Sequence, residues 1–407
     1  MIEPTITRHG STLAFIWPDS PLKMVLSRFH DSSRGSDAEI QVLAANGSHD
    51  AGLITSAKIN LSSLPTRKKF AQELATLTPG NKTDWLAMVQ QCCILGLRAH
   101  RAGEPIVLLQ PQEQANVPFL LDPLIFEKHQ TLVYAPGGLC KSYLALYLAL
   151  VACHGGTHNG FSANRCPVLY LDWELDAFTI GTRLTRLHRG HPELSRHAPF
   201  YRACSSPLYE EADVISEEIA KKNIRLVIID SAIMACGDDM NSTQAPKQLQ
   251  RALRQMGCAS LVLSHVAKNT EEKTAYGNVF FQNLCRNQYQ AQLVDESDQQ
   301  KRITLTNSKI NFGAFQPLKG VSFDFNNSAC RVSTFNPEQE EACQDKLPLP
   351  SRIRNLLDDG EPRSAMEISE ELTIKPSTLK PILSKYRGVK WVMVGENRTA
   401  RWTVLNR

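Results

Sequence analysis

The sequence predicts an α/β protein with a parallel-sheet core, an N-terminal α+β module and a C-terminal winged helix-turn-helix. The core is indicated by short apolar runs that alternate with amphipathic segments, because strands that are buried on both faces are apolar along their whole length. The C-terminal fold is indicated by three helical segments followed by two strand-like runs, which meet at a Gly-Glu-Asn turn.

Composition divides the 407 residues into four segments. Residues 1–110 carry the strand-like runs "TLAFIW", "EIQVLAA" and "AKINL" and then two helical stretches, which predicts the α+β module. Residues 115–330 carry the alternating strands and helices of the core. Residues 331–349 include the polar, proline-punctuated "NPEQEEACQDKLPLP" and are predicted to be a linker. The winged helix is predicted over residues 350–407.

Charge and cysteine usage are those of an ordinary soluble protein. The 45 basic and 41 acidic side chains leave a formal net charge of only +4, so any nucleic-acid contact must come from locally placed basic residues. The eleven cysteines form no C-x-x-C pair and follow no secretory leader, which predicts reduced thiols and a cytoplasmic location. The apolar run from Lys141 to His154 is shorter than the roughly 20 residues that span a bilayer, so we expect a buried helix and no membrane contact.

The segment after the first core strand has the outline of a phosphate-binding loop, G-x-x-x-x-G-K-[ST]. In such a loop, backbone N–H groups surround the phosphates at a helix N-terminus, the lysine reaches the terminal phosphates and the hydroxyl ligates Mg²⁺. Alanine and cysteine replace the two glycines of the pattern, and the cysteine costs about 1–2 kcal/mol if its φ is positive. The predicted nucleotide-binding residues are Ala135, Pro136, Gly137, Gly138, Leu139, Cys140, Lys141, Ser142 and Tyr143.

Three further polar residues end or follow core strands. Asp230 ends "LVIID" and is the predicted Walker-B acid, which would hold Mg²⁺ together with Ser142. Glu174 closes "VLYLDWE", where it could orient or deprotonate the attacking water. His265 ends "LVLSH", where it could sense the γ-phosphate. ATP and Mg²⁺ are therefore the predicted cofactors, and ATP is preferred to GTP because no guanine-reading N-K-x-D motif is suitably placed.

The segment from about residue 115 to 325 resembles the RecA-like ATPases of plasmid and phage replication, which are related to the hexameric DnaB-type helicases. The resemblance rests on "YAPGGLCKS", "VLYLDWE", "LVIIDS", "VLSHVAK" and "YGNVFFQNLCRN". It implies that Glu174 is the catalytic glutamate, Asp230 the Walker-B acid and His265 the strand-end histidine. Cys140 departs from the family pattern and leaves the turnover rate in question.

The same resemblance implies a homo-oligomer, usually a hexameric ring, with ATP between subunits and a basic residue supplied by the neighbour. Such a residue accelerates hydrolysis because it stabilises charge that develops on the transferred phosphoryl group. The two candidates are Lys309, which we favour slightly, and Arg286; the alternative is that either is an ordinary surface charge.

Basic residues in two regions are predicted to contact DNA. Lys268 and Lys273 lie in a loop that would face single-stranded DNA in a central pore, although neighbouring acids weaken this prediction. In the tail, a recognition helix capped at Ser377 and a wing would bind duplex DNA; the predicted contacts are Lys375, Thr378, Lys380, Lys385, Arg387, Arg398 and Arg401. A winged helix also serves in some proteins as a protein-interaction module.

Three functions remain open from the sequence. The first is an ATP-dependent DNA motor, a ring-forming helicase or helicase-like ATPase of a mobile element. The second is a nucleotide-gated DNA-binding regulator with slow or no hydrolysis, which Cys140 favours and Glu174 opposes. The third is a RecA-like recombination or repair ATPase, which would form filaments.

Overall fold

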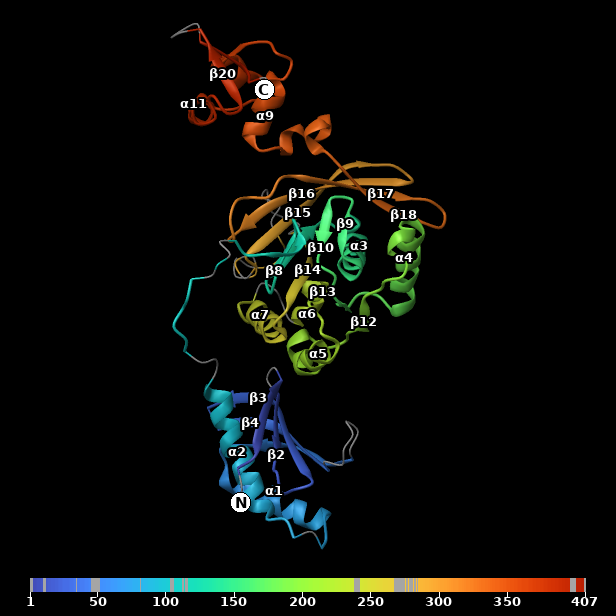
Figure 1. Ribbon diagram of the computed structural model, residues 1–407, viewed down its shortest axis with the longest axis vertical. Coiled ribbons are helices and arrows are strands. Elements are labelled where there is room, and N and C mark those ends of the chain that lie inside the picture. Colours follow the sequence, from blue (N-terminus) through green and yellow to red (C-terminus); the bar gives the residue numbers. More distant parts are fainter. Residues whose placement is uncertain are drawn as a thin grey trace.

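The structure is a computed structural model and describes residues 3–9, 12–33, 35–44, 52–80, 82–102, 106–111, 113, 116–237, 242–266, 275, 277, 281, 283, 285–395 and 400–405. Figure 1 shows an N-terminal module, a large central sheet with its helices, and a small C-terminal module, which follow one another along the long axis. Separate clusters of buried apolar side chains lie in the N-terminal module, on the two faces of the central sheet and in the C-terminal module.

The N-terminal module is a five-stranded antiparallel sheet packed against two helices. The strands follow chain order across the sheet, and two of them, the first and third, were not expected from the sequence. Its elements are β1 (Thr5–His9), β2 (Thr12–Ile16), β3 (Leu22–Ser32), β4 (Gly35–Ala44), β5 (Leu53–Asn60), α1 (Leu64–Leu77) and α2 (Trp85–Ala102).

The central sheet has nine strands in the order β12-β11-β13-β14-β8-β15-β16-β17-β18. The first six are mutually parallel, as the apolar runs predicted, and the last three extend the sheet in antiparallel fashion. The bounds are β8 (Gln130–Ala135), β11 (Val168–Asp172), β12 (Phe200–Ala203), β13 (Leu226–Asp230), β14 (Ala259–His265), β15 (Asn287–Glu296), β16 (Gln300–Ile310), β17 (Lys319–Phe325) and β18 (Cys330–Phe335).

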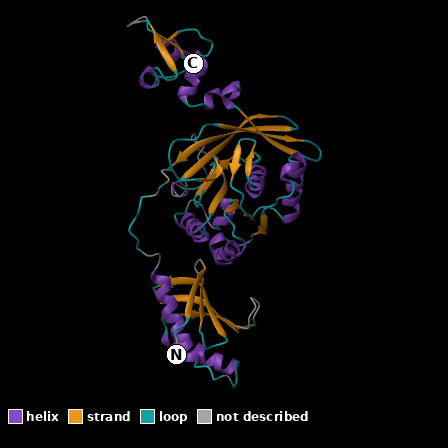
Figure 2. Ribbon diagram, in the orientation of Figure 1, coloured by secondary structure: helices purple, strands orange, loops and turns teal. Residues whose placement is uncertain are grey.

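Helices cover both faces of the parallel strands (Figure 2), so alternate residues of each strand enter different cores. In β8, Val133 packs with α3 and α4, whereas Leu132 packs with α5, α6 and α7. These helices are α3 (Lys141–His154), α4 (Ala177–Gly190), α5 (Leu208–Lys222), α6 (Ala232–Cys236) and α7 (Gln244–Met256). A short 3-10 helix, η1 (Pro192–Leu194), follows α4, and a second sheet of four short strands lies beside α3; it contains β6 (Phe119–Asp122), β7 (Ile125–Phe126), β9 (Gly156–His158) and β10 (Phe161–Ala163).

The apolar helix α3 is buried along most of its length, as the sequence predicted. Its 14 residues are too few to cross a bilayer. Within the described part of the chain, no helix combines the length and the apolar character that a membrane span requires.

The C-terminal module contains three helices and a three-stranded sheet in the order β19-β21-β20. Because β18 continues the central sheet to Phe335, the sheet extends past residue 331, where the linker was predicted to start, and two short 3-10 helices follow. The elements are η2 (Pro337–Gln339), η3 (Glu341–Lys346), α9 (Leu349–Leu357), β19 (Arg363–Ser364), α10 (Ala365–Glu371), α11 (Pro376–Lys385), β20 (Trp391–Val394) and β21 (Arg401–Val404).

Candidate nucleotide-binding and catalytic site

The predicted chemical residues meet at one edge of the central sheet because their strands are parallel and end together. Ala135 at the end of β8 lies opposite His265 at the end of β14, and Asp172 at the end of β11 lies opposite Asp230 at the end of β13. Strand β14 lies between β8 and β13, so the loop after β8 and the acid at the end of β13 flank His265. We call this edge, where β8, β11, β13 and β14 end, the carboxyl edge.

The predicted phosphate loop connects β8 to α3 and is open on one side. A Cβ added at Gly137 or Gly138 would meet no atom within 4 Å, so both glycines face free space. Gly138 has a φ of +78°, in the left-handed region that favours glycine. The loop therefore has an open concavity at the N-terminus of a 14-residue helix, where backbone N–H groups and the helix dipole favour anions.

Cys140 occupies a glycine position of the phosphate-loop pattern, and its backbone has a conformation that favours glycine. It is the N-cap of α3, with φ 54° and ψ 23°, in the left-handed region. A non-glycine residue there costs about 1–2 kcal/mol, and no side-chain hydrogen bond caps the helix. Burial raises the pKa of the Cys140 thiol, and the nearby Lys301 partly opposes this shift. The thiol is therefore neutral, and it adds no charge to the loop at neutral pH.

Lys141 is the first residue of α3 and folds back over the loop. Its Nζ donates to the carbonyl of Ala135 at 3.1 Å and to that of Pro136 at 2.9 Å. The side chain is buried, and this burial lowers the pKa of the ammonium group, while Asp230 and Glu174 act in the opposite direction. The neutral carbonyl partners leave the positive charge uncompensated within the loop, as an anion-binding site requires.

Asp230 is buried at the end of β13 and is held by two hydroxyl groups. The hydroxyl of Tyr170, on β11, donates to Asp230 Oδ2 at 2.6 Å, and Ser142 on α3 makes a second hydrogen bond with the carboxylate. Burial raises the pKa of Asp230, and the two hydroxyl donors oppose this shift. Ser142 and Asp230, the pair predicted to hold a metal ion, thus lie in direct contact across two elements.

Glu174 lies in the turn after β11, and the buried Asp172 determines its place. Asp172 Oδ1 accepts from the backbone N–H of Glu174 at 2.9 Å and from that of Leu175 at 3.1 Å, which fixes the turn. The Ser231 hydroxyl donates to Glu174 Oε1 at 2.5 Å. His265 Nε2 lies 3.9 Å from the same oxygen, which is too long for a hydrogen bond.

These partners keep Glu174 ionised. The His265 imidazole and the Ser231 hydroxyl lower the pKa of Glu174 to about 2, with a further contribution from the Lys141 charge and against the raising effect of burial. At neutral pH the group is a carboxylate that can accept a hydrogen bond from water. A base of such low pKa removes protons poorly, so this arrangement favours orientation of a water molecule over its deprotonation.

The residues at the carboxyl edge fit a magnesium-bound nucleoside triphosphate. The open loop offers backbone N–H groups, and Lys141 carries a charge that could move from two carbonyls to phosphate oxygens. Ser142 and Asp230 are the hydroxyl and carboxylate that such sites use to hold Mg²⁺. Within the described residues, no group of three or more His, Cys, Asp or Glu side chains is arranged to hold a metal ion without phosphate oxygens.

Comparison with known proteins gives the same class. Residues 104–271, less than half of the chain, match the family described as the AAA domain. The matched segment contains the predicted phosphate loop, Glu174, Asp230 and His265. No curated protein matches the chain. Among solved structures, a KaiC-like protein from the hyperthermophilic archaeon Pyrococcus horikoshii OT3 is similar, with 12% identity, over 56% of this chain and 99% of that one. The TM-score of this comparison is 0.39.

The two basic residues expected to act on a neighbouring subunit lie away from the predicted phosphate loop of the same chain. Lys309 on β16 pairs with Gln288, which lies opposite Leu132, well before the end of β8. Arg286 precedes β15 and borders a hollow of about 680 Å³ together with Lys128, at the amino edge of the sheet, where the parallel strands begin. Neither residue is placed to serve the phosphate loop of its own chain.

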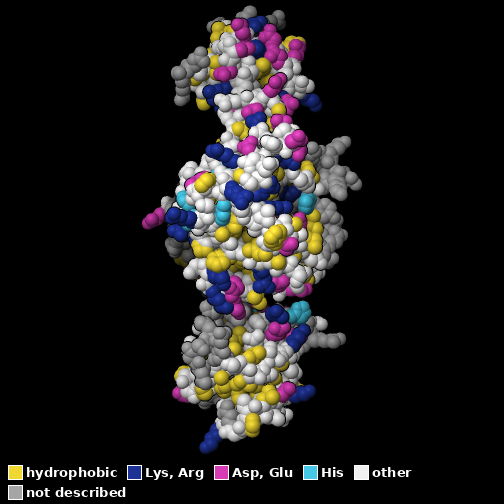
Figure 3. Space-filling view, turned by 90° about the vertical axis from the view of Figure 1, so that its right-hand side faces the viewer, with side chains coloured by type: hydrophobic (Ala, Val, Ile, Leu, Met, Phe, Trp, Pro, Cys, Tyr) yellow, Lys and Arg dark blue, Asp and Glu magenta, His cyan; other side chains and the backbone are white. Residues whose placement is uncertain are grey.

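A lysine that the sequence did not single out contacts the loop instead. Lys301, near the start of β16, donates from Nζ to the carbonyl of Gly138 at 2.9 Å. On the other side of the loop, Arg183 of α4 lies over the ring of Tyr143, with its Cζ 5.4 Å from the ring centroid. Figure 3 views the side of the molecule that carries α4, and basic side chains gather there. Lys301 thus brings a cation to the loop from a strand that is distant in sequence.

The predicted DNA contacts have different outcomes. Lys268, Lys273 and Arg398 lie outside the described residues. Arg401 donates to the carbonyl of Pro362 and to Glu367 within the module. The other predicted contacts are exposed on α11 or directly beside its two ends; they are Lys375, Thr378, Lys380, Lys385 and Arg387. The helix starts at Pro376 with Lys375 as its N-cap, so the predicted cap at Ser377 is wrong, because proline is favoured at the first helical position.

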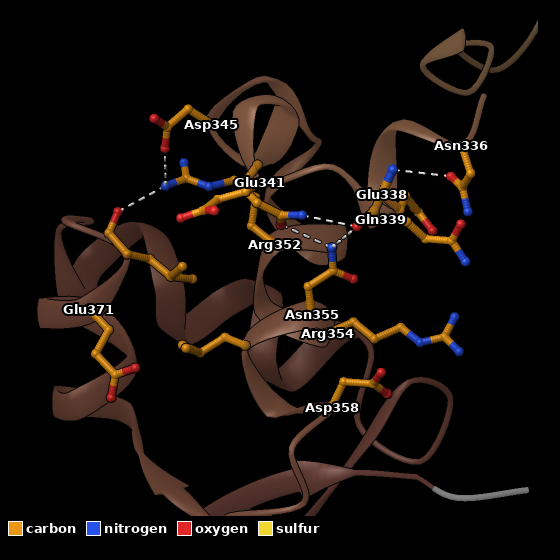
Figure 4. A pocket seen from close by; sticks show the side chains of 13 residues that line it. Asn336, Glu338, Gln339, Glu341, Asp345, Arg352, Arg354, Asn355, Asp358 and Glu371 are labelled. Atoms are coloured by element: carbon orange, nitrogen blue, oxygen red, sulfur yellow. Dashed lines mark hydrogen bonds and ion pairs between the residues drawn. The ribbon is translucent and has the colours of Figure 1, made fainter. Parts of the chain in front are cut away.

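A hollow of about 920 Å³ lies between the short helices η2 and η3 and the C-terminal module (Figure 4). Asn355 donates to the Glu338 carbonyl and to Gln344 there, and Arg352 donates to the Leu372 carbonyl. Its acidic lining residues are Glu338, Glu341, Asp345, Asp358 and Glu371, against Arg352 and Arg354. An excess of carboxylates repels phosphate, so this hollow is not a nucleotide site.

Three residues that support the site were missed at the level of sequence. Asp172 caps the Glu174 turn, Tyr170 donates to Asp230, and Ser231 donates to Glu174. Tyr170 and Asp172 lie in "LYLDWE", and Ser231 directly follows the Walker-B acid. A polar residue inside an otherwise buried strand is a usable signal, because its polar atoms must find partners.

Proposed function

We propose that this protein is an ATP-driven DNA motor of the ring-forming helicase type, in which hydrolysis at the carboxyl edge moves or remodels DNA. The observation that carries the proposal is the position of Glu174, an ionised carboxylate near the loop lysine and the Walker-B acid. A protein that only binds nucleotide has no need of a carboxylate fixed by Asp172, Ser231 and His265. The arrangement therefore favours a hydrolase.

The chain's own residues suggest how water and phosphate would be held. Lys141 would exchange the carbonyls of Ala135 and Pro136 for phosphate oxygens. Glu174 would accept a hydrogen bond from the water molecule and align it for in-line attack on the γ-phosphate. Bound Mg²⁺ would supply charge neutralisation of the phosphate oxygens, and Ser142 and Asp230 would hold it. His265, beside Glu174, is placed to respond to the γ-phosphate.

Two features support action on DNA by a ring. The proposed winged helix is supported by the three helices and the three-stranded sheet that the described residues of the C-terminal module form, and α11 exposes lysines for phosphate contacts. Lys309 and Arg286 lie toward the amino edge, where they could complete the site of a neighbouring subunit. A ring in which each subunit completes its neighbour's site would use both features.

The test is steady-state ATP turnover with and without single-stranded DNA, together with duplex binding at several salt concentrations. We expect DNA-stimulated turnover, and we expect Lys375→Glu with Lys380→Glu to weaken duplex binding and lower the salt slope by about two, since each lost phosphate contact removes about one. The matched control makes the same charge change at the exposed Lys68 and Lys69 of α1. The proposed motor function would be rejected if DNA did not change the ATP turnover rate and if the α11 variant and the α1 control variant bound duplex DNA equally well.

A nucleotide-gated DNA-binding regulator is the second candidate, and the left-handed backbone of Cys140 favours it. If the Cys140 conformation slows hydrolysis, Cys140→Gly removes the unfavourable Cβ and raises turnover about 5- to 30-fold, since about 1–2 kcal/mol is released. Turnover that is already rapid in the wild type and changes less than two-fold in Cys140→Gly would exclude the regulator. The wild-type protein and the variant are compared at saturating ATP.

A further inference from the structure

The β15–β16 hairpin reaches past the end of the strand that carries the phosphate loop. Strand β15 pairs in parallel with β8 as far as Gln290 opposite Tyr134, and then runs on to Glu296. Strand β16 returns antiparallel, with Lys301 opposite Glu296. The tip of this hairpin therefore projects beyond the carboxyl edge, on the side of the sheet where the loop lies.

Lys301 occupies a defined position at that tip. Its Nζ forms an ion pair with Glu296 Oε1 at 2.6 Å and donates to the carbonyl of Gly138 at 2.9 Å. Its side chain is 17% exposed, and the bond to Gly138 lies at the protein surface. A carboxylate from the same hairpin and a carbonyl from the loop thus fix the ammonium group between two segments that are distant in sequence.

The bond to Gly138 also fixes the orientation of one peptide plane. In a planar trans peptide the C=O and the following N–H point in opposite directions, so the Gly138 carbonyl and the Leu139 N–H are coupled. When Lys301 holds the carbonyl toward the hairpin, the Leu139 N–H must point away from it. We propose that Lys301, held by Glu296, is a positioning residue that keeps the phosphate loop in its anion-binding form.

The loop needs such support because of its own composition. Gly138 and Cys140 both have φ in the left-handed region, at +78° and 54°. The Cys140 conformation is unfavourable for a residue with a side chain, and a charge-assisted hydrogen bond is among the stronger contacts that can offset it. Lys141 bonds to the start of the loop through Ala135 and Pro136, whereas Lys301 bonds to its middle at Gly138, so the two lysines restrain different parts of the loop.

The inference rests on the proposed ATPase function, and the experiment measures binding of fluorescent ATP and ADP analogues to the full chain alongside steady-state turnover. We expect Lys301→Met to weaken both nucleotides about ten-fold, as loss of one charged hydrogen bond implies. The KM for ATP rises by the same factor and kcat stays within about two-fold. Lys301→Arg keeps the charge and the donor groups and restores most of the affinity, and Glu296→Gln gives a smaller loss.

The matched control is Lys319→Met, because Lys319 also donates to a glycine carbonyl, that of Gly160, but outside the phosphate loop. We expect this variant to bind nucleotide like the wild type. Thermal melting of both variants separates loss of binding from loss of folding. If Lys301→Met lowers the melting temperature no more than Lys319→Met does, the loss of nucleotide affinity in Lys301→Met results from a change in the phosphate loop and not from unfolding.

Each outcome bears on the proposal. Unchanged affinity in Lys301→Met overturns it and leaves the ATPase function in place. A loss confined to ATP, with ADP unaffected, also overturns it, because Lys301 would then contact the γ-phosphate directly. Equal losses in Lys301→Met and Lys319→Met would indicate general destabilisation and overturn it as well. A wild-type protein that binds neither nucleotide rejects the proposed function together with this inference.

Discussion

The two edges of the central sheet differ in what they present to a nucleotide. At the carboxyl edge, four parallel strands end together and bring Lys141, Asp230, Glu174 and His265 into one site. Lys309 and Arg286 lie toward the amino edge. Burial lowers the pKa of Lys309, and repulsion from the nearby Arg286 charge lowers it further. The candidate phosphate site thus lies at the carboxyl edge, whereas the amino edge presents Lys309, Arg286 and the Glu127–Arg225 ion pair.

The β15–β16 hairpin connects the two edges and explains the difference. Lys301 near its tip contacts the phosphate loop, while Lys309, later in the same strand, lies toward the opposite edge. The sequence distance between the two lysines is short, yet only one can serve the site of its own chain.

The largest expected effect breaks the carboxyl edge. We predict that Glu174→Gln lowers the ATP turnover rate by about 10³-fold, within the 10²–10⁴ range of a positioned catalytic group, because an amide holds water less well than a carboxylate. Nucleotide affinity should change little, since Lys141 and the loop remain. Steady-state kinetics and analogue binding measure the two effects, with Glu210→Gln on α5 as the matched control. A rate within five-fold of the wild type would contradict the role given to Glu174.

The second prediction concerns the amino edge. Lys309→Ala should lower turnover about 10²-fold if its charge stabilises the transferred phosphoryl group of a neighbour. The decisive measurement mixes Lys309→Ala subunits with Lys141→Ala subunits, each inactive alone. Recovery of activity in the mixture shows that the two residues serve one site from different chains. If Lys309→Ala is fully active, Lys309 does not stabilise the phosphoryl group of a neighbour. The same mixing test with Arg286→Ala then shows whether Arg286 does.

The smallest effect concerns the acid limit of turnover. Because the pKa of Glu174 is lowered to about 2, the carboxylate is ionised throughout the neutral range and protonates only as the pH falls toward that value. Ser231→Ala removes a donor that lowers this pKa, so the acid limb of the kcat profile should move to higher pH, with turnover at pH 7 nearly unchanged. Ser195→Ala, at a hydroxyl bonded to the Pro192 carbonyl, is the control. Superimposed profiles would show that Ser231 does not influence Glu174.

Many residues of the carboxyl edge could be predicted because the sequence patterns that indicate them are short and local. Apolar strands that end in a polar residue gave the positions of Asp230, Glu174 and His265, and parallel strands place such ends together. From the sequence, Cys140 was expected to be unfavourable only if its φ were positive. The structure shows that its φ is positive, at 54°.

Other parts could not be predicted because their signals are not local. Strands β17 and β18 lack the uniform apolar character of the core strands, since they pair antiparallel at the border of the sheet. The supporting contacts of Tyr170 and Ser231 join residues about 60 positions apart in the chain. No sequence pattern connects such pairs when only one chain is known.

The sequence by itself determined the chemistry of this protein: a phosphate loop with Lys141 and Ser142, an acid after each of two strands, and an altered residue at Cys140. Tertiary structure alone decided which charges serve that loop. Lys301 reaches Gly138 from a strand more than 160 residues away, as the separation of 163 shows, while Lys309 does not. The physical reason is that side-chain identity is encoded residue by residue, whereas the register of a strand depends on every pairing across the sheet.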